Sequence, residues 1–214
     1  MPGLAVGKDD VRRVVADGLG PILVEHGFRA LPSGLRFKRA IPEGRQEVDV
    51  VLAMNPPYAR GKIHVVPQYT WCLPKVGALC KEMVGGNPRI GRIDDVVFWG
   101  QLAPLSYLQE HADWYFEDLS QSPKLSWQQA EFFSRWVVPF CDEYRSAEDF
   151  VRGYFAKDSR LALNLYEVPS VAAALVILGR SDEARVLVQA NLKKAEDQHY
   201  SLQPMLDHIS TRAI

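Results

Sequence analysis

The sequence is poor in cysteine and holds no arrangement typical of a metal site. Its three cysteines, Cys72, Cys80 and Cys141, are odd in number, and none stands in a C-x-x-C pair. Both features argue against a disulfide framework and against a zinc knuckle. No histidine stands four positions from another, as two zinc ligands on one helix would require. We therefore expect no metal, no cofactor and reduced thiols in a cytoplasmic protein.

Long apolar stretches and an excess of one charge are also absent. No segment reaches the roughly 18 uncharged apolar residues of a membrane span, and the first residues contain no apolar core of a secretion signal. The 25 basic and 26 acidic residues leave a net charge of -1. This balance provides no general attraction to a nucleic-acid backbone or to an anionic bilayer. We expect a protein that is neither secreted nor membrane-bound and that does not bind nucleic acid.

Flexible linkers and internal repeats are missing as well. No Gly- or Ser-rich segment separates the halves of the 214 residues, and the composition, 47% hydrophobic and 24% charged, is that of a globular protein. A chain of this length buries a substantial core. We expect an α+β region over residues 1–120 and a helical region over 121–214, packed together as one compact unit.

The first half of the chain has the pattern of a helix followed by three strands. Apolar residues spaced three and four apart from Val11 to Leu23 predict an amphipathic helix that Gly27 ends. Three extended segments follow, at 35–39, 47–52 and 62–66, with turn residues between them at 42–44 and 55–57. The predicted fold is α+β: an N-terminal helix packed on an antiparallel β-meander, followed by a mostly helical C-terminal half.

The second half is predicted to be mostly helical. Ser126 with Gln129, and Ser146 with Asp149, have the spacing of capping boxes at helix starts. Further helices are predicted at 74–84, 171–178 and 182–195, and a short strand at 96–99. A glycine-containing turn at 179–181 joins the last two helices, which predicts an αα-hairpin.

Two short motifs suggest known chemistry without its usual context. Asn55-Pro56-Pro57-Tyr58 resembles the N-P-P-Y element of amino-group DNA methyltransferases, in which the tyrosine stacks on an extruded base. The Gly-rich cofactor turn and the alternating strands and helices of that family are missing here, and a proline-stiffened hairpin turn explains the same residues. The Gly85–Arg92 segment could surround an anion with its backbone N–H groups and arginines. It lacks the spacing of a P-loop, and a plain connecting loop is the favoured interpretation.

Glu47, Asp49 and His64 form the most enzyme-like grouping in the sequence. The two carboxylates are two residues apart, so they share one face of a strand, and His64 can lie across from them on the next strand. An acid and a histidine in one place are candidates for acid/base catalysis. A solvated strand face explains the same pattern, and this alternative stays open.

Two other segments are candidate binding surfaces. Trp114, Tyr115 and Phe116 cannot all point into one helical stripe, so they are the favoured protein contact if they are exposed together. Arg36 and Arg39 flank an aromatic residue and could contact nucleic acid. With the net charge near zero, an amphipathic strand that keeps its charges in water is the favoured interpretation of that segment.

The first third of the chain resembles a bacterial family. The helix end His26-Gly27-Phe28-Arg29, the aromatic and basic strand Leu35–Arg39 and the meander after it are similar to the family named domain of unknown function 4304. This resemblance covers residues 11–71, implies an α+β fold in a bacterial cytosolic protein and implies no catalytic residue. The segment Leu178–Ala184 is similar to the turn of a tetratricopeptide repeat, although no second copy follows and a single αα-hairpin explains it.

The missing catalytic signatures, the balanced charge and the aromatic-rich helical half favour a non-enzymatic, protein-binding module of the bacterial cytoplasm. The alternative is a small-molecule-binding protein or enzyme with a pocket between sheet and helices, using Glu47, Asp49 and His64. The sequence predicts no oligomeric state.

Overall fold

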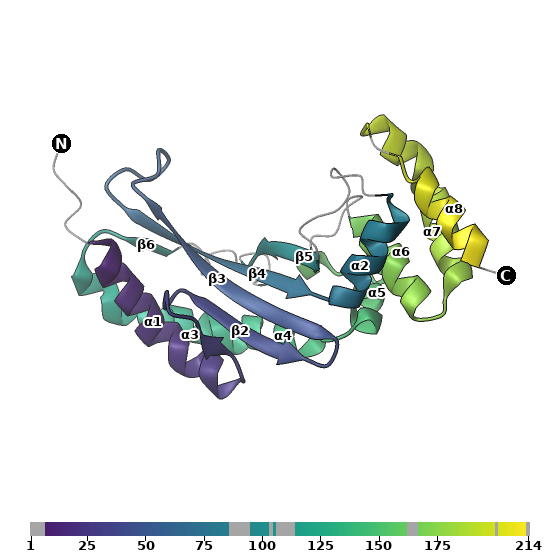
Figure 1. The fold of residues 1–214 in the computed structure, drawn as a ribbon. Coiled ribbons are helices and arrows are strands. Elements are labelled where there is room, and N and C mark those ends of the chain that lie inside the picture. Colours follow the sequence, from purple (N-terminus) through teal and green to yellow (C-terminus); the bar gives the residue numbers. More distant parts are fainter. Residues whose placement is uncertain are drawn as a thin grey trace. The chain divides into compact units, whose positions relative to one another are not determined.

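The structure is a computed structural model, and it describes residues 7–85, 95–102, 105, 114–161, 167–199 and 201–212. The helices are α1 (Lys8–Glu25), α2 (Pro74–Met83), α3 (Ser122–Phe132), α4 (Val138–Glu143), α5 (Ala147–Phe155), α6 (Val168–Ile177), α7 (Ser181–Asp197) and α8 (Gln203–Arg212). The strands are β1 (Arg29–Ala30), β2 (Arg36–Ile41), β3 (Gly44–Met54), β4 (Ile63–Cys72), β5 (Val96–Gln101) and β6 (Trp114–Phe116) (Figure 1). The predicted α+β class is confirmed.

The six strands found in the described residues form one antiparallel sheet. Their order is β1-β2-β3-β4-β5, and β6 pairs with β4 beside this path. The strands β2, β3 and β4 therefore form the predicted meander, because each is hydrogen-bonded to the next strand in the chain. In β4 the side chains alternate between buried and half-buried, which is the period-two pattern of a sheet with one covered face.

The chain divides into two compact units, each built from segments that are distant in sequence. The first unit comprises 1–40, 46–70 and 100–143, and the second comprises 41–45, 71–99 and 144–214. The expected division lay near residue 120. The structure instead groups 100–143 with the N-terminal segments and 71–99 with the C-terminal helices, because β-strand pairing and helix packing join distant parts of the chain.

In the first unit, α1, α3 and α4 lie on one face of the strands (Figure 1). The predicted apolar stripe of α1 is present, with Val11, Val15, Leu19 and Leu23 buried, and α1 packs along α3. Gly27 follows the end of α1 with φ 81°, a left-handed conformation that glycine adopts without strain. The opposite face of these strands carries no helix within the described part of this unit (Figure 1).

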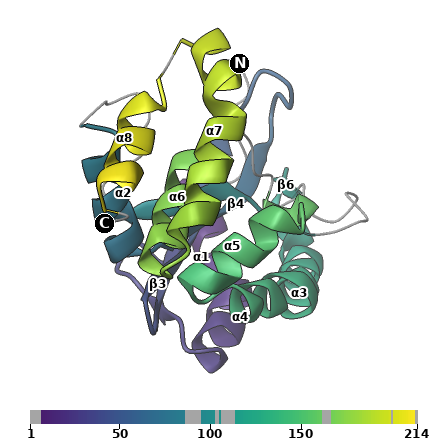
Figure 2. The same ribbon diagram turned by 90° about the vertical axis from the view of Figure 1, so that its right-hand side faces the viewer.

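The second unit is centred on α6, which is buried along almost its whole length. It packs against α2, α5 and α7, and α8 packs against α7 and α2 (Figure 2). The predicted αα-hairpin is present as α6 and α7, and Gly179 turns between them with φ 75°. Trp71 fills the core of this unit with edge-to-face contacts to Tyr144 and Phe150.

Of the two residues predicted to cap a helix, Ser146 does so and Ser126 does not. Ser146 precedes α5, and its hydroxyl oxygen accepts a hydrogen bond from the N–H of Asp149 at 3.2 Å. Ser126 lies inside α3, which starts at Ser122 and has a proline in its first turn. The helix begins one turn earlier because Pro123 fits the first turn of a helix, where no N–H is needed.

Candidate functional site

The uncovered strand face carries two ion pairs between β2 and β3. Arg36 pairs with Asp49, and the ammonium nitrogen of Lys38 lies 3.7 Å from a carboxylate oxygen of Glu47. The side chains of Glu47 and Asp49 are only 15% and 23% exposed. Both proposed catalytic carboxylates are thus held by a cation on the neighbouring strand, an arrangement that stabilises strand pairing.

His64 lies on the same face as these carboxylates but farther along the sheet. The N–H of Asn55 donates to the carbonyl of Lys62 at 2.9 Å, which aligns the end of β3 with the start of β4. This pairing places His64 on β4 opposite Ala53 on β3. Ala53 is four residues from Asp49 along β3, which is about 13 Å. The alignment therefore does not bring His64 to the two carboxylates as the sequence suggested.

A group of rings surrounds His64 instead, and we call Tyr58, His64 and Tyr115 the aromatic row. His64 and Tyr115 are paired across β4 and β6, and their rings stack with centroids 4.5 Å apart and planes 19° apart. The hydroxyl of Tyr58 hydrogen-bonds Nδ1 of His64 at 2.9 Å, and the two rings meet edge to face. Tyr58 is nonetheless 67% exposed, so it is a fixed side chain with most of its ring in solvent.

The turn that carries Tyr58 is the N-P-P-Y motif, and it is rigid. Asn55 has φ 48°, and its side-chain oxygen accepts a hydrogen bond from the N–H of Gly61 at 2.8 Å. The N–H of Ala59 donates to the carbonyl of Pro56 at 2.9 Å. The motif therefore builds a proline-stiffened hairpin turn in an antiparallel sheet, whereas a methyltransferase would place it beside a parallel, doubly wound sheet.

The predicted contact of three adjacent aromatic residues is wrong for two of them. Trp114 and Phe116 are buried on the covered face of β6, at 2% and 0% exposure, and only Tyr115 faces the other side. The segment is a strand rather than a helix, so its side chains alternate between faces. Trp114 packs against Phe132 and Phe133 of the first unit's core.

The two arginines proposed for binding have different roles. Arg36 is exposed and paired with Asp49. Arg39 is buried, and its guanidinium donates to the side-chain oxygen of Gln46, the carbonyl of His26 and the carboxylate of Asp142. A strand whose arginines are paired or buried offers no basic surface to a nucleic acid.

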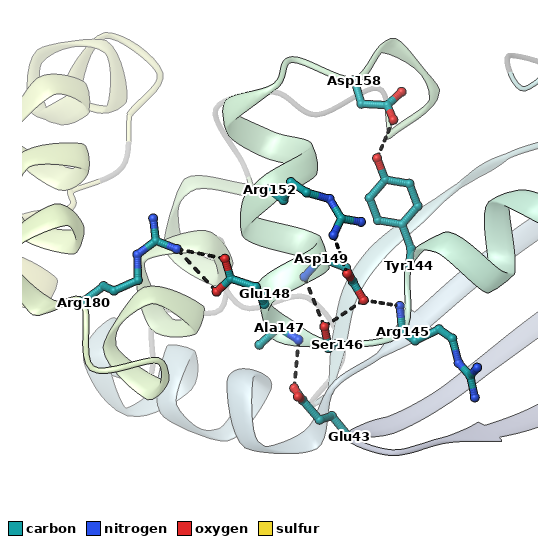
Figure 3. Close-up of polar contacts among 10 residues, drawn as sticks. All are labelled: Glu43, Tyr144, Arg145, Ser146, Ala147, Glu148, Asp149, Arg152, Asp158 and Arg180. Atoms are coloured by element: carbon teal, nitrogen blue, oxygen red, sulfur yellow. Dashed lines mark hydrogen bonds and ion pairs between the residues drawn. The ribbon is translucent and has the colours of Figure 1, made fainter.

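A second polar cluster lies at the start of α5 in the second unit (Figure 3). The carboxylate of Glu43, from the turn between β2 and β3, accepts the N–H of Ala147 at 2.8 Å, and Ser146 accepts that of Asp149. Arg180 approaches Glu148 from the turn after α6. The N–H groups of Ala147 and Asp149 are thus bonded to the chain's own side chains, so this cluster stabilises the start of the helix.

The three thiols of the chain are poor candidates for nucleophilic catalysis. Cys72, Cys80 and Cys141 are buried, and burial raises the pKa of Cys80 to about 11 and that of Cys141 to about 12. Such thiols stay protonated and are poor nucleophiles. No group of three potential metal ligands is found among the described residues. The proposed anion loop, from residue 86 onward, lies outside them.

Fold and site together define an α+β protein with an aromatic row on one face of an antiparallel sheet, in which Tyr58 is exposed and His64 and Tyr115 are half-buried. Comparisons with protein-family models, curated proteins and solved structures found no match. The described residues contain no membrane-spanning helix.

Proposed function

We propose that this chain is a non-enzymatic protein-binding module of the bacterial cytoplasm and that the aromatic row is its contact surface. The observation that carries the proposal is Tyr58, which is two-thirds exposed while its hydroxyl is fixed by His64. The three buried cysteines, none of which forms a disulfide, fit a reducing compartment.

A fixed aromatic ring is well suited to binding another protein. Tyrosine is enriched among residues that dominate interface energies, because it buries a large area and also offers a hydroxyl. Ordering a free side chain on binding costs about 0.5–1.5 kcal/mol, and a side chain already held in place avoids most of this cost. By contrast, Glu47 and Asp49 are engaged by cations, which leaves the enzyme alternative without a free acid/base pair at these positions.

The proposal predicts that Tyr58→Ala strongly weakens capture of a partner. The tagged intact chain is used to capture proteins from a bacterial lysate, alongside Tyr58→Ala and Trp127→Ala. Trp127 is a matched control because it is 63% exposed on α3, away from the row. We expect a stoichiometric partner with the wild type and with Trp127→Ala, and about thirtyfold weaker binding of the purified partner by Tyr58→Ala.

Tyr58→Phe separates the ring from its hydroxyl. This variant keeps the aromatic surface and loses the bond to His64, so we expect about fivefold weaker binding from lost preorganisation. Equal capture by wild type and Tyr58→Ala would contradict the proposed surface. Capture of no partner by the wild type would contradict the protein-binding function and favour a screen for small ligands.

A further inference from the structure

Several of the charges on the face that carries the aromatic row are held in ion pairs. Lys62 pairs with Glu117 at 2.5 Å, Arg36 pairs with Asp49, and Lys38 pairs with Glu47. Arg60 is exposed in the same turn as Tyr58, and among the described residues it makes no ion pair. One positive charge is therefore left unbalanced next to the most exposed ring of the row.

The exposed Arg60 near Tyr58 indicates which charge a partner should carry at this surface. The turn segment 55–62 contains two basic residues and no acidic one. Covering Arg60 with a neutral surface would remove a guanidinium from water without compensation, whereas a carboxylate would form a charge-assisted, bidentate pair with it. We propose that the aromatic row and Arg60 bind an acidic protein segment, with a carboxylate on Arg60 and an apolar side chain against Tyr58. This inference rests on the proposed function.

A nucleic acid fits the same surface less well. Binding a phosphate backbone requires several cations, each of which displaces a counterion, and among the described residues of the turn 55–62 only Arg60 is without an ion pair. Lys62 could contribute only by leaving Glu117. The chain as a whole carries a net charge of -1. The surface thus favours one or two carboxylates over a chain of phosphates.

The test uses a displayed library of random peptides, selected for binding to the intact chain at low salt. Enriched peptides are then measured against wild type, Arg60→Glu, Lys193→Glu and Tyr58→Ala. Lys193→Glu is the matched control, because it makes the same charge change at an exposed lysine on α7. We expect peptides rich in Asp and Glu, bound about tenfold more weakly by Arg60→Glu and equally by the control.

The outcomes separate this inference from the proposed function. Neutral or basic peptides that lose binding in Tyr58→Ala would overturn the acidic partner and leave the aromatic row as a contact surface. Peptides that bind Tyr58→Ala as well as wild type, or no enriched peptides at all, would overturn both. Tight binding of labelled single-stranded RNA that is lost in Arg60→Glu would also overturn the acidic partner, in favour of a nucleic acid.

Discussion

At the scale of single residues, Arg39 shows how a charged side chain becomes part of a core. Besides its bonds to Gln46, His26 and Asp142, its guanidinium lies 4.7 Å from the ring centre of Phe28. Gln46 is itself fully buried and donates to the carbonyl of Cys141 at 2.7 Å. The network joins the end of α1, the strands β2 and β3, and α4 within the first unit, so each buried polar atom that it contains has a partner in the protein.

Arg39→Ala should destabilise the protein by about 3 kcal/mol. The substitution leaves the buried oxygen of Gln46 without its donor and removes the cation that faces Asp142. Urea unfolding, followed by circular dichroism, measures the change in the free energy of unfolding. Arg36→Ala is the control, because Arg36 is exposed and its pair with Asp49 contributes less than about 1 kcal/mol. Equal losses for both variants would refute the structural role of Arg39.

The lowered pKa of Asp158 predicts that the protein loses stability as the pH falls. Burial alone would raise the pKa of Asp158, but hydrogen bonds from Arg160 and from Tyr144 outweigh it and lower the pKa to about 2. Figure 3 shows the bond from Tyr144. A lowered pKa in the folded state contributes stability above the unfolded value, near 4, that is lost as the pH falls toward 2. We expect this residue to account for about 1 kcal/mol of the stability lost between pH 6 and pH 3.

The variant Asp158→Asn isolates that contribution. Urea unfolding of wild type and variant at both pH values gives the difference, and the variant should lose about 1 kcal/mol less on acidification. A parallel loss in both proteins would show that other carboxylates govern the acid response.

Some of these residue roles could be predicted from sequence and others could not. Gly27 and Ser146 were predicted correctly, because helix ends have local signals within a few residues. The contact of Glu43 with Ala147 spans 104 positions, and the pairing of Arg39 with Asp142 spans 103. No local sequence pattern predicts such contacts, because the two residues come together only in the folded protein. The sequence identifies Tyr58 only as part of a motif. Its exposure and its bond to His64 depend on the structure of the hairpin.

At the scale of elements, the alternation of side chains along each strand decides which residues face the core and which face the other side of the sheet. The meander was predictable because its strands alternate and turn residues separate them. The structure of segment 114–116 was harder to predict. Three aromatic residues in succession show neither the period of two residues typical of a strand nor the period of 3.6 residues typical of a helix. Pairing of β6 with β4 sets its faces, and this pairing is a property of the tertiary fold.

The start of β3 requires a residue without a side chain. A Cβ atom on Gly44 would lie 2.0 Å from the backbone carbonyl oxygen of Cys72 and 3.0 Å from the ring of Pro74. Backbone atoms cannot move aside as a flexible side chain can, so Gly44→Ala should destabilise the protein by about 3 kcal/mol or abolish folding. Gly20→Ala on α1 is the control, since a Cβ there meets nothing within 4 Å. Thermal unfolding of both variants measures the difference, and similar melting temperatures would contradict the close approach.

At the scale of the whole molecule, the chain is built from two units whose segments alternate along the sequence. Strands β2, β3 and β4 each contribute residues to both units. This explains why the composition shows no linker and why a boundary near residue 120 was expected from the change in helical pattern. The candidate surface in the first unit lies on a hairpin, while the tetratricopeptide-like α6–α7 hairpin belongs to the second.

Hydrogen exchange of the intact chain, with and without its captured partner, tests the central claim most directly because it compares the two hairpins in one experiment. Our account predicts that the partner slows exchange across residues 53–64 and leaves α7 unchanged. Slower exchange in α6 and α7 with residues 53–64 unaffected would contradict the account and make the helical hairpin the binding surface.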